Sequence, residues 1–395
     1  MSVSDPPSLD LPEPSVGDRQ LSAELSAQIK QAITTAGGSI GFDEYMEQAL
    51  YSPQLGYYSS SRRRFGSQGD FVTSPEISSL FTRCLAHQAA EVFATLGSKD
   101  RRILEAGSGS GIMARDLITA LEQDHGGLNE YLILERSAAA RAQQRETLGV
   151  LAERVRWLDD FPEAGFRGLI VGNELLDALP GVRFVMGESG PEELRVVTTK
   201  DSFDWQPSAF TNVAVLSALE TTLSECDPLA LGYVSEFAPA QAAWVGTLLG
   251  SLDAGLLLLF DYGYPRREFY HPQRTRGTLA CHYRHRMHED PFRYPGLQDI
   301  SVHVDFTAIA EAALAAQQYL TGYTTQANFL IAAGLLDIAG IDAGGSVSEQ
   351  ARMSSEIQRL TLPSQLGEAV KVMAISPDPE MMLSGFAGRD LSDGL

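Results

Sequence analysis

The 395-residue sequence has little cysteine, no long apolar run and no visible targeting segment, and each shortage excludes a class of protein. Its three cysteines, Cys84, Cys226 and Cys281, are far apart, which excludes a disulfide framework and a Cys-x-x-Cys metal pair. No apolar run reaches membrane-spanning length, and residues 256–260 are long enough only for a core strand. Residues 1–20 lack the features of a secretory signal and of a mitochondrial presequence. We therefore expect a cytoplasmic protein without a membrane partner.

Positive charge is scarce as well. The chain carries 30 lysine and arginine residues against 51 aspartate and glutamate residues, a net charge of -21. Such a surface repels nucleic acid phosphates and would tolerate or attract a basic protein partner. Hydrophobic residues make up 44% of the chain and charged residues 21%, as in a soluble globular protein longer than one ordinary domain. We expect no nucleic-acid partner.

The sequence is organised around a glycine-rich turn that joins a short apolar strand to a helix. Ile103 and Leu104 read as the end of a buried strand, and residues 112–121 have helical spacing. The glycines between them are Gly107, Gly109 and Gly111. They let the backbone turn sharply and approach a ligand without a Cβ in the way. This arrangement predicts a nucleotide-cofactor corner at the carboxyl end of the first strand of an α/β sheet.

Glu105 and the glycine spacing indicate which cofactor this turn binds. A dinucleotide site needs Gly-x-Gly-x-x-Gly/Ala, but Ile112 occupies its last small position. A carboxylate two residues before the first glycine would repel a pyrophosphate and suits a cationic amino acid head. Glu-x-Gly-x-Gly-x-Gly resembles motif I of S-adenosylmethionine-dependent methyltransferases. The pattern therefore favours a methyltransferase over a nicotinamide-dependent oxidoreductase and over a turn without a ligand.

Strands and helices alternate after the turn, which predicts a doubly wound, Rossmann-like α/β sheet. With the first strand, the predicted strands at 131–135, 155–158, 168–174, 255–261, 319–323 and 370–375 make seven. About eighty residues separate the fourth and fifth strands, too many for one crossover. We therefore expect insertions at about 181–250 and 262–300. In the first, we expect a strand pair at 182–184 and 194–199 and helical material at 205–226 and 238–252.

The residues before the sheet are expected to form an N-terminal helical and lid region, 21–100, ahead of a catalytic domain at 101–395. Residues 1–20 are expected to be a disordered tail. The spacing predicts helices over 21–37, 40–50 and 76–96, with Asp43 as a cap of the second. The irregular residues 51–75 are expected to form a lid over the cofactor, because long loops in compact chains are usually functional. The candidate cofactor-binding residues here are Asp70, Thr73, Ser74, Pro75 and Glu76.

Acidic residues follow the second and third strands. Glu135 ends the second strand, where a carboxylate can accept hydrogen bonds from both ribose hydroxyls of a nucleoside. Its alternative is a solvated carboxylate at a strand end. Asp159 or Asp160, after the third strand, could accept the adenine amino group, or cap a helix before residues 161–162.

Asn173, Glu174 and Asp177 follow the apolar fourth strand and are the candidate catalytic residues. A carboxylate pair suits a guanidinium group, which it can bind through paired hydrogen bonds. It can also help remove the proton lost as nitrogen attacks, a demanding step because the arginine pKa exceeds about 12. The alternative is that Asn173 and Asp177 cap the following helix. We favour a role in the active site for Glu174.

The segment 281–288 combines Cys281 with three histidines at a spacing of three, which could line one side of a helix. A structural zinc site usually needs four ligands, and no second cluster exists in the sequence. The interleaved arginines would also repel a cation. We therefore expect no metal here, and we interpret the run Arg62, Arg63 and Arg64 as a solvated loop.

Together these stretches resemble the MidA-like methyltransferases, a family that includes mitochondrial assembly factors for respiratory complex I. The matching segments are 51–58, 69–77, 105–111, 173–180, 261–264, 276–279 and 299–306. They occur in family order over roughly residues 40–330. The most distinctive is Asn-Glu-Leu-Leu-Asp-Ala-Leu-Pro at 173–180.

This resemblance implies a seven-stranded class I methyltransferase fold that uses S-adenosyl-L-methionine. It also implies methylation of an arginine on a protein substrate, with a complex I subunit as the target of the mitochondrial members. This sequence lacks their presequence, which suggests a bacterial relative with a different counterpart substrate. A non-catalytic assembly or binding factor that keeps the fold is the alternative, and a homodimer is left open.

Overall fold

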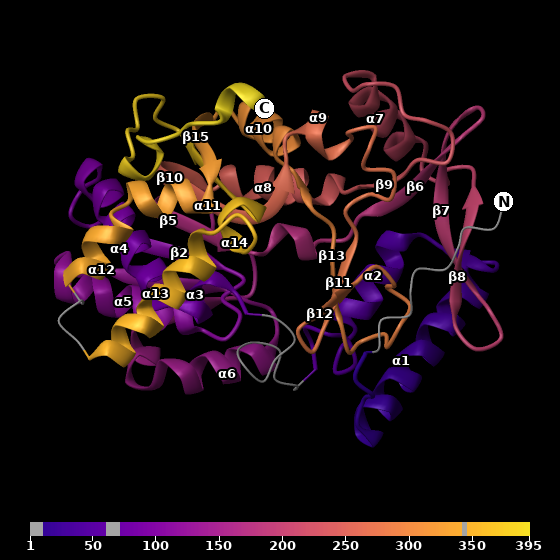
Figure 1. Ribbon diagram of the computed structural model, residues 1–395, viewed down its shortest axis with the longest axis horizontal. Helices are drawn as coiled ribbons and strands as arrows, with labels where there is room; N and C mark the ends of the chain where they lie inside the picture. The colour runs from indigo at the N-terminus through magenta and orange to yellow at the C-terminus, as the bar shows by residue number, and fades with distance from the viewer. Residues whose placement is uncertain (1–10, 61–71, 342–345) are drawn as a thin grey trace.

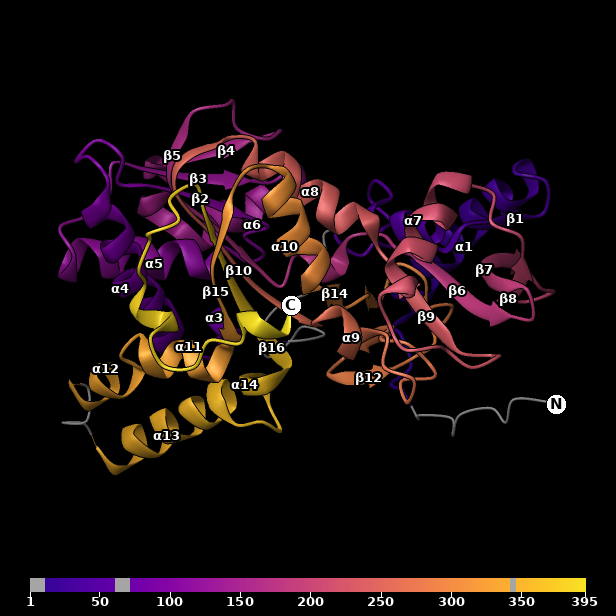
Figure 2. The ribbon, with the colours of Figure 1, turned by 90° about the horizontal axis from the view of Figure 1, so that it is seen from above.

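The computed structural model describes residues 11–60, 72–341 and 346–395, which fold into two adjoining parts. Figure 2 shows the large central sheet with its helices on one side of the molecule and a smaller, mostly β part on the other. The amino-terminal helices lie in the smaller part (Figure 1), and the carboxyl terminus lies between the two parts (Figure 2). The described helices include none with both the length and the apolar character needed to cross a bilayer.

The large part contains the predicted seven-stranded sheet. Its strands are β2 (Arg102–Ala106), β3 (Glu130–Leu134), β4 (Val155–Leu158), β5 (Phe166–Asn173), β10 (Leu252–Tyr264), β15 (Tyr319–Thr325) and β16 (Val370–Ser376). Their order across the sheet is β15-β16-β10-β5-β2-β3-β4, and β14 (Val304–Asp305) pairs with the end of β10. Neighbouring strands from β4 to β10 are parallel, whereas β16 is antiparallel to β10 and β15. The strand order reverses at β2, because β3 and β4 lie on one side of it and the chain then crosses over to β5 on the other.

Apolar side chains cover both faces of this sheet. Along β2 and β5, Ile103 and Leu169 contribute to one hydrophobic cluster, while Leu104 and Ile170 contribute to the other. Successive residues of a strand point to opposite faces, so a continuous apolar run buries both. The short apolar runs of the sequence therefore became central strands.

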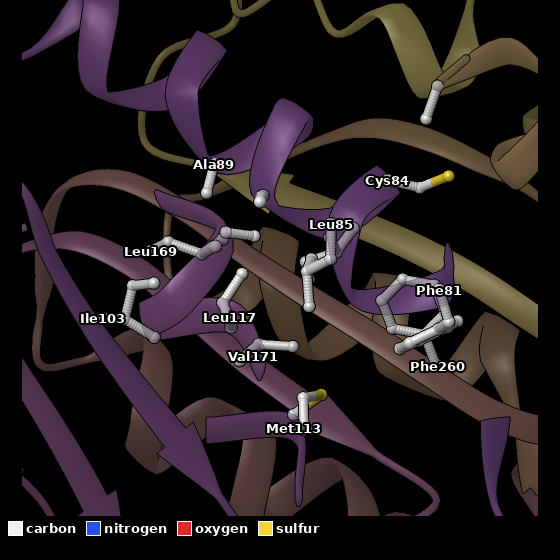
Figure 3. Packing of buried hydrophobic residues seen from close by; sticks show 14 of the residues in the cluster. Phe81, Cys84, Leu85, Ala89, Ile103, Met113, Leu117, Leu169, Val171 and Phe260 are labelled. Carbon is white, nitrogen blue, oxygen red and sulfur yellow. The ribbon is translucent and has the colours of Figure 1, made fainter. Parts of the chain in front are cut away.

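Helices cover the two faces. One face carries α4 (Ser79–Thr95), α5 (Ile112–Asp124), α6 (Ala138–Leu148), α11 (Gln326–Ala332), α12 (Leu335–Ile341) and α13 (Val347–Thr361), and the other carries α8 (Pro239–Leu249) and α10 (Phe306–Ala315). Figure 3 shows Phe81, Leu85 and Ala89 of α4 above side chains of β2, β5 and β10. Phe81 contacts Phe260 edge to face, with ring centroids 5.0 Å apart. The helical stretch between β15 and β16 ends with α14 (Leu366–Ala369).

The smaller part combines the amino terminus with both insertions. It contains α1 (Val16–Thr35), β1 (Ser39–Ile40), α2 (Phe42–Tyr51), β6 (Val182–Gly187), β7 (Gly190–Thr198), β8 (Phe203–Ser208), α7 (Val213–Ser224), β9 (Val234–Phe237), α9 (Arg266–Phe269), β11 (Ala280–Tyr283), β12 (Arg286–His288) and β13 (Asp299–Ser301). Five of its strands form one sheet, and β12-β11-β13 form another. The predicted strand pair is confirmed, because β6 and β7 are antiparallel neighbours. The first insertion and the amino-terminal helices share this core, since β1 pairs with β7.

Four expectations for individual elements are wrong. The tail was expected to reach residue 20, but α1 begins at Val16 with Ser15 as its N-cap, and Leu11 is buried. Asp43 lies inside α2 and does not cap it. The predicted helix over 76–96 is broken at Ser78, whose hydroxyl accepts a hydrogen bond from the Leu80 backbone amide and starts α4. Residues 203–208 form the strand β8, which pairs antiparallel with β7, where helical material was expected from residue 205.

Candidate functional site

The glycine turn lies between β2 and α5 and has the backbone shape that requires glycine. The φ angles of Gly107, Gly109 and Gly111 are 70°, 52° and 84°, in the left-handed region that side chains disfavour. A Cβ on Gly107 would lie 2.7 Å from the Leu175 Cδ1 atom, and one on Gly111 would lie 3.1 Å from the Gln144 Cα atom. The turn is therefore packed closely against neighbouring elements, and side chains cannot be added there without displacing them.

Glu105 has a different environment from the one expected. It is buried in the sheet, and its carboxylate accepts a hydrogen bond of 2.6 Å from the Tyr131 hydroxyl of β3. Burial raises the pKa of Glu105 to about 7. The carboxylate thus connects the first two strands beneath the glycine turn, and direct contact with a cofactor stays a prediction.

Glu135 lies beside the glycine turn, at the carboxyl edge of the sheet. One oxygen of its carboxylate accepts a hydrogen bond of 2.8 Å from the Ser137 backbone amide. The other accepts one of 3.3 Å from the Gln144 side-chain amide, which also donates to the Gly109 carbonyl at 3.2 Å. The structure therefore brings the predicted ribose-binding carboxylate and the glycine turn together through one side chain.

Asp159 and Asp160 lie after β4 and are exposed. Asp159 pairs with Arg141 of α6 at 2.7 Å. Asp160 accepts hydrogen bonds from the Phe161 amide at 3.0 Å and from Arg136 at 3.4 Å. No helix follows within the described residues 161–165, so the cap interpretation is wrong, and contact with an adenine stays a prediction for both residues.

The short helix α3 (Ser74–Ile77) connects the glycine turn to the carboxyl edge of β5. The Ser110 hydroxyl in the turn donates a hydrogen bond of 2.7 Å to the Glu76 carboxylate. At the other end of α3, the Ser74 amide donates to the Glu174 carboxylate at 3.3 Å. Thr73 is the N-cap of this helix and Pro75 lies in its first turn. These four candidates thus lie at the site, whereas Asp70 falls outside the described residues.

Glu174 follows β5 in a strained conformation. Its φ angle is 50°, uncommon for a residue with a side chain and often associated with functional sites. Its carboxylate accepts hydrogen bonds from Ser74 and, at 3.3 Å, from the Asn173 side-chain amide. Burial and the neighbouring Asp261 carboxylate raise the pKa of Glu174 to about 8. The group can therefore hold or release a proton near neutral pH.

Asp177 is buried in the 3-10 turn Leu176–Ala178, which has no side-chain cap. Burial, followed by the charges of Asp261, Asp299 and Glu174, raises the pKa of Asp177 well above its usual value. The interpretation of Asn173 and Asp177 as helix caps is therefore wrong. The Asn173 side-chain oxygen is buried and has no hydrogen-bond partner within the described residues.

Two further carboxylates at this site were missed as candidates. Asp261 lies in β10, one residue after Phe260, which pairs with Asn173 of β5. It accepts hydrogen bonds from the amides of Leu175 and Leu176 at 3.0 and 2.7 Å. Burial raises the pKa of Asp261 to about 7. The rule that found Glu174, an acid at the carboxyl end of a predicted strand, would also have found Asp261.

Asp299 comes from β13, in the second insertion. It begins the family-matching segment 299–306, but no local pattern marked it as a site residue. The Tyr58 hydroxyl donates a hydrogen bond of 2.8 Å to its carboxylate, and the Ser301 hydroxyl donates one of 3.3 Å. The ring of Tyr58 is stacked on that of Tyr51, with centroids 5.6 Å apart. The chain next to Asp299 is joined to the acidic turn, because the Val302 amide donates to the Asp177 carbonyl at 2.8 Å.

The histidines of segment 281–288 lie on a β-hairpin rather than on the helix considered from sequence. His282 is in β11, His288 is in β12, and His285 is in the turn between them. Throughout residues 11–60, 72–341 and 346–395, no three histidine, cysteine or acidic side chains are grouped to hold a metal ion.

These features fit a nucleoside cofactor with a cationic amino acid tail. The left-handed glycines place no side chain of their own over the backbone of the turn. Glu135 offers carboxylate oxygens at the end of β3, where a ribose lies in folds of this topology. The acidic groups after β5 and within β10 favour positive charge at the adjoining position. So does the Asn173 oxygen, which accepts no hydrogen bond from the described part of the chain.

Comparison with known proteins gives the same assignment. The family model described as "Putative S-adenosyl-L-methionine-dependent methyltransferase" matches residues 84–324, more than half of the chain. A Burkholderia thailandensis protein crystallised with S-adenosyl-homocysteine is 41% identical, with a TM-score of 0.90 over 98% of this chain and 100% of that one.

Two mitochondrial proteins named protein arginine methyltransferases are more distant relatives. The Drosophila melanogaster NDUFAF7 homolog is 27% identical over 94% of this chain and 89% of its own length. Human NDUFAF7 is 26% identical over 86% of this chain and 80% of its own length. From the family match and the crystallised relative, the chain belongs to the MidA-like family of S-adenosyl-L-methionine-dependent methyltransferases.

Proposed function

We propose that this methyltransferase modifies an arginine side chain of a protein substrate. The observation that carries the proposal is the group of carboxylates beside the glycine turn. They are Glu174, Asp177, Asp261 and Asp299. They lie close enough that the charges of the other three raise the pKa of Asp177. A buried group of this kind costs free energy unless a cation occupies it, and a guanidinium group is a planar cation that pairs with carboxylates.

Glu174 is the residue we assign to proton removal. Bound S-adenosyl-L-methionine supplies a methyl group on a positively charged sulfur, and the protein contributes mainly alignment. A guanidinium nitrogen must lose a proton during methylation, although the arginine pKa exceeds about 12. The pKa of Glu174, raised to about 8 by burial, makes it a stronger base than an ordinary carboxylate. The hydrogen bond from Ser74 holds its carboxylate next to α3 and the glycine turn.

The named relatives support the same substrate class. Both NDUFAF7 proteins are called protein arginine methyltransferases, and they cover most of this chain. From the family resemblance we further propose that the substrate is a respiratory complex I subunit or a bacterial counterpart. We also propose a cytoplasmic location.

The test is a comparison of methylarginine in the proteins of the host, measured by mass spectrometry, with and without this chain. We expect at least one methylated arginine to disappear and to return when wild-type protein is restored. Glu174→Gln should not restore it, because the amide cannot accept the proton. The matched control is Glu163→Gln, which changes an exposed residue between β4 and β5 and should restore it fully.

The purified protein provides the second arm of the test. It should transfer a labelled methyl group to the protein that carries the lost methylarginine. If the label appears only on lysine, on a carboxyl group or on a small molecule, the arginine assignment is wrong although the enzyme class stands. If no arginine changes in the host and none is labelled in vitro, the proposal fails.

A further inference from the structure

Gln144 lies on α6 at the junction of three elements that form the cofactor side of the site. It has no exposed surface. Its amide nitrogen donates to the Gly109 carbonyl at 3.2 Å and to the Glu135 carboxylate at 3.3 Å. Its amide oxygen accepts a hydrogen bond of 2.8 Å from the Trp157 indole of β4. One side chain thus connects the glycine turn, the end of β3 and the neighbouring strand.

These contacts use both donors of the amide and one lone pair of its oxygen. A side chain with no exposed surface cannot contact a ligand directly, so any effect on the cofactor must pass through its partners. The close packing of α6 against the turn limits movement, because a Cβ on Gly111 would already lie 3.1 Å from the Gln144 Cα atom. Gln144 is therefore held in one orientation.

We propose that Gln144 is a positioning residue for S-adenosyl-L-methionine, which holds the Glu135 carboxylate and the Gly109 turn in the geometry that binds the cofactor. The Ser137 amide holds the first oxygen of Glu135, and Gln144 holds the second. Without Gln144 the second oxygen of Glu135 and the Gly109 carbonyl each lose this donor. The inference rests on the cofactor and is independent of the proposed arginine substrate.

Trp157 of β4 provides the third hydrogen-bond partner of the Gln144 side chain. Its indole donates to the Gln144 oxygen, and the Arg145 guanidinium lies over its ring at 4.3 Å from the centroid. This contact selects the amide orientation in which the nitrogen, rather than the oxygen, faces Glu135 and Gly109. A glutamine is needed here, because a carboxylate would face two acceptors.

The test measures binding of S-adenosyl-homocysteine by calorimetry to the purified full-length protein and two variants. Gln144→Met keeps the volume and the burial but removes all three hydrogen bonds. We expect its affinity to fall at least about tenfold, since each lost hydrogen bond is worth a severalfold change in an equilibrium constant. The matched control is Gln143→Met at the neighbouring, partly exposed position of the same helix, which should bind as the wild type does.

Gln144→Glu separates positioning from a purely structural effect. It keeps an acceptor for Trp157 but places a second carboxylate against Glu135, so binding should be weak at about pH 8. At about pH 5 the pair can share a proton, which restores a donor to Glu135, and affinity should recover relative to wild type. The charged groups that contact this arrangement include Arg141, which donates to the Glu135 carbonyl and pairs with Asp159, and Arg145, which lies over the Trp157 ring.

Two results would overturn the proposal. One is a folded Gln144→Met protein, by circular dichroism, that binds S-adenosyl-homocysteine within twofold of wild type. The other is a Gln144→Glu protein whose affinity follows the wild-type pH profile. If Gln144→Met does not fold, the pH profile of Gln144→Glu decides the question alone.

Discussion

Among single residues, Gly109 shapes the cofactor side of this site, both because it has no side chain and because its carbonyl accepts a hydrogen bond. Gly109 has a φ angle of 52°, and its carbonyl accepts the Gln144 amide. A side chain at this position would meet a backbone penalty of roughly 1–2 kcal/mol and would also occupy the surface offered to the cofactor.

We predict that Gly109→Val abolishes binding of S-adenosyl-homocysteine, measured by calorimetry. The matched control is Gly149→Val at the end of α6, where φ is 54° and the space around the Cβ position is open. Both variants place a β-branched side chain at a positive φ angle, so both should melt at a lower temperature. Only Gly109→Val should lose the ligand, and retained binding would contradict the assignment of the turn.

The raised pKa of Glu174 predicts how the stability of the protein depends on pH. Its pKa is raised from 4.5 to about 8 by burial, so the folded state holds a proton that the unfolded state releases. Stability from this group therefore falls as pH rises from about 4.5 to about 8 and then levels off. Glu174→Gln removes this loss, because an amide does not ionise.

We therefore expect Glu174→Gln to gain stability relative to wild type between about pH 5 and pH 9, by at least about 1 kcal/mol. Urea denaturation at the two pH values measures the difference. An equal gap at both values would mean that Glu174 is ionised throughout, and would contradict the raised pKa on which its strength as a base depends. Glu163→Gln serves as the control.

At the scale of elements, α3 connects the two sides of the site. The cofactor side contains the glycine turn and Glu135, and the acceptor side contains the carboxylates Glu174, Asp177, Asp261 and Asp299. The Ser74 amide of α3 contacts Glu174, and Glu76 of α3 contacts the glycine turn. The Ser74 hydroxyl also donates a hydrogen bond of 2.7 Å to Gln326 of α11, whose amide nitrogen donates to the Leu360 carbonyl at 3.1 Å. A buried glutamine therefore holds this four-residue helix against the large part.

We predict that Gln326→Leu releases α3 and lowers stability by about 1–3 kcal/mol, because buried polar partners lose their hydrogen bonds. Hydrogen exchange should show faster exchange at residues 74–77, and methyl transfer should fall with it. Gln358→Leu, on the exposed side of α13, is the control. Unchanged exchange in the Gln326→Leu protein would show that α3 is held by other contacts.

At the scale of the whole molecule, the acceptor side is assembled from both parts. The large part supplies Glu174, Asp177 and Asp261, and the smaller part supplies Asp299. Gln241 of α8 connects them, because its amide nitrogen donates to the carbonyls of Leu176 at 3.0 Å and Val302 at 3.1 Å. The glycine turn, Glu135 and Gln144, in contrast, all belong to the large part.

Because the acidic groups come from both parts, we predict that methyl transfer can be lost while binding of S-adenosyl-homocysteine is kept. Gln241→Met should lower methyl transfer at least about tenfold, because two hydrogen bonds that align the acidic groups are lost. Binding of S-adenosyl-homocysteine should stay within twofold of wild type. Ala243→Met, on the exposed face of α8, should change neither. Equal loss of both activities would show instead that Gln241 supports the fold as a whole.

Much of this architecture could be predicted from local patterns. The seven strands, the antiparallel pair β6 and β7, and the helix after the glycine turn were all predicted, with boundaries shifted by a few residues. The errors arose where a local pattern had two interpretations. Residues 205–208 belong to a strand paired with β7, although they fell within the helical interpretation of 205–226. Ser78 caps a new helix inside an apparently continuous one.

The sequence by itself determined the sheet, the glycine turn and the acids at the ends of its strands, because these follow from the spacing of neighbouring residues. Only the tertiary structure decided that Asp299 lies beside Asp177 and that Gln144 contacts both Glu135 and Gly109. Burial then set the proton affinities of the acidic groups, since the pKa of a carboxyl group depends on solvent and on charges contributed by distant segments. Contacts between segments far apart in the sequence produce no local periodic pattern, so they become visible only in the folded structure.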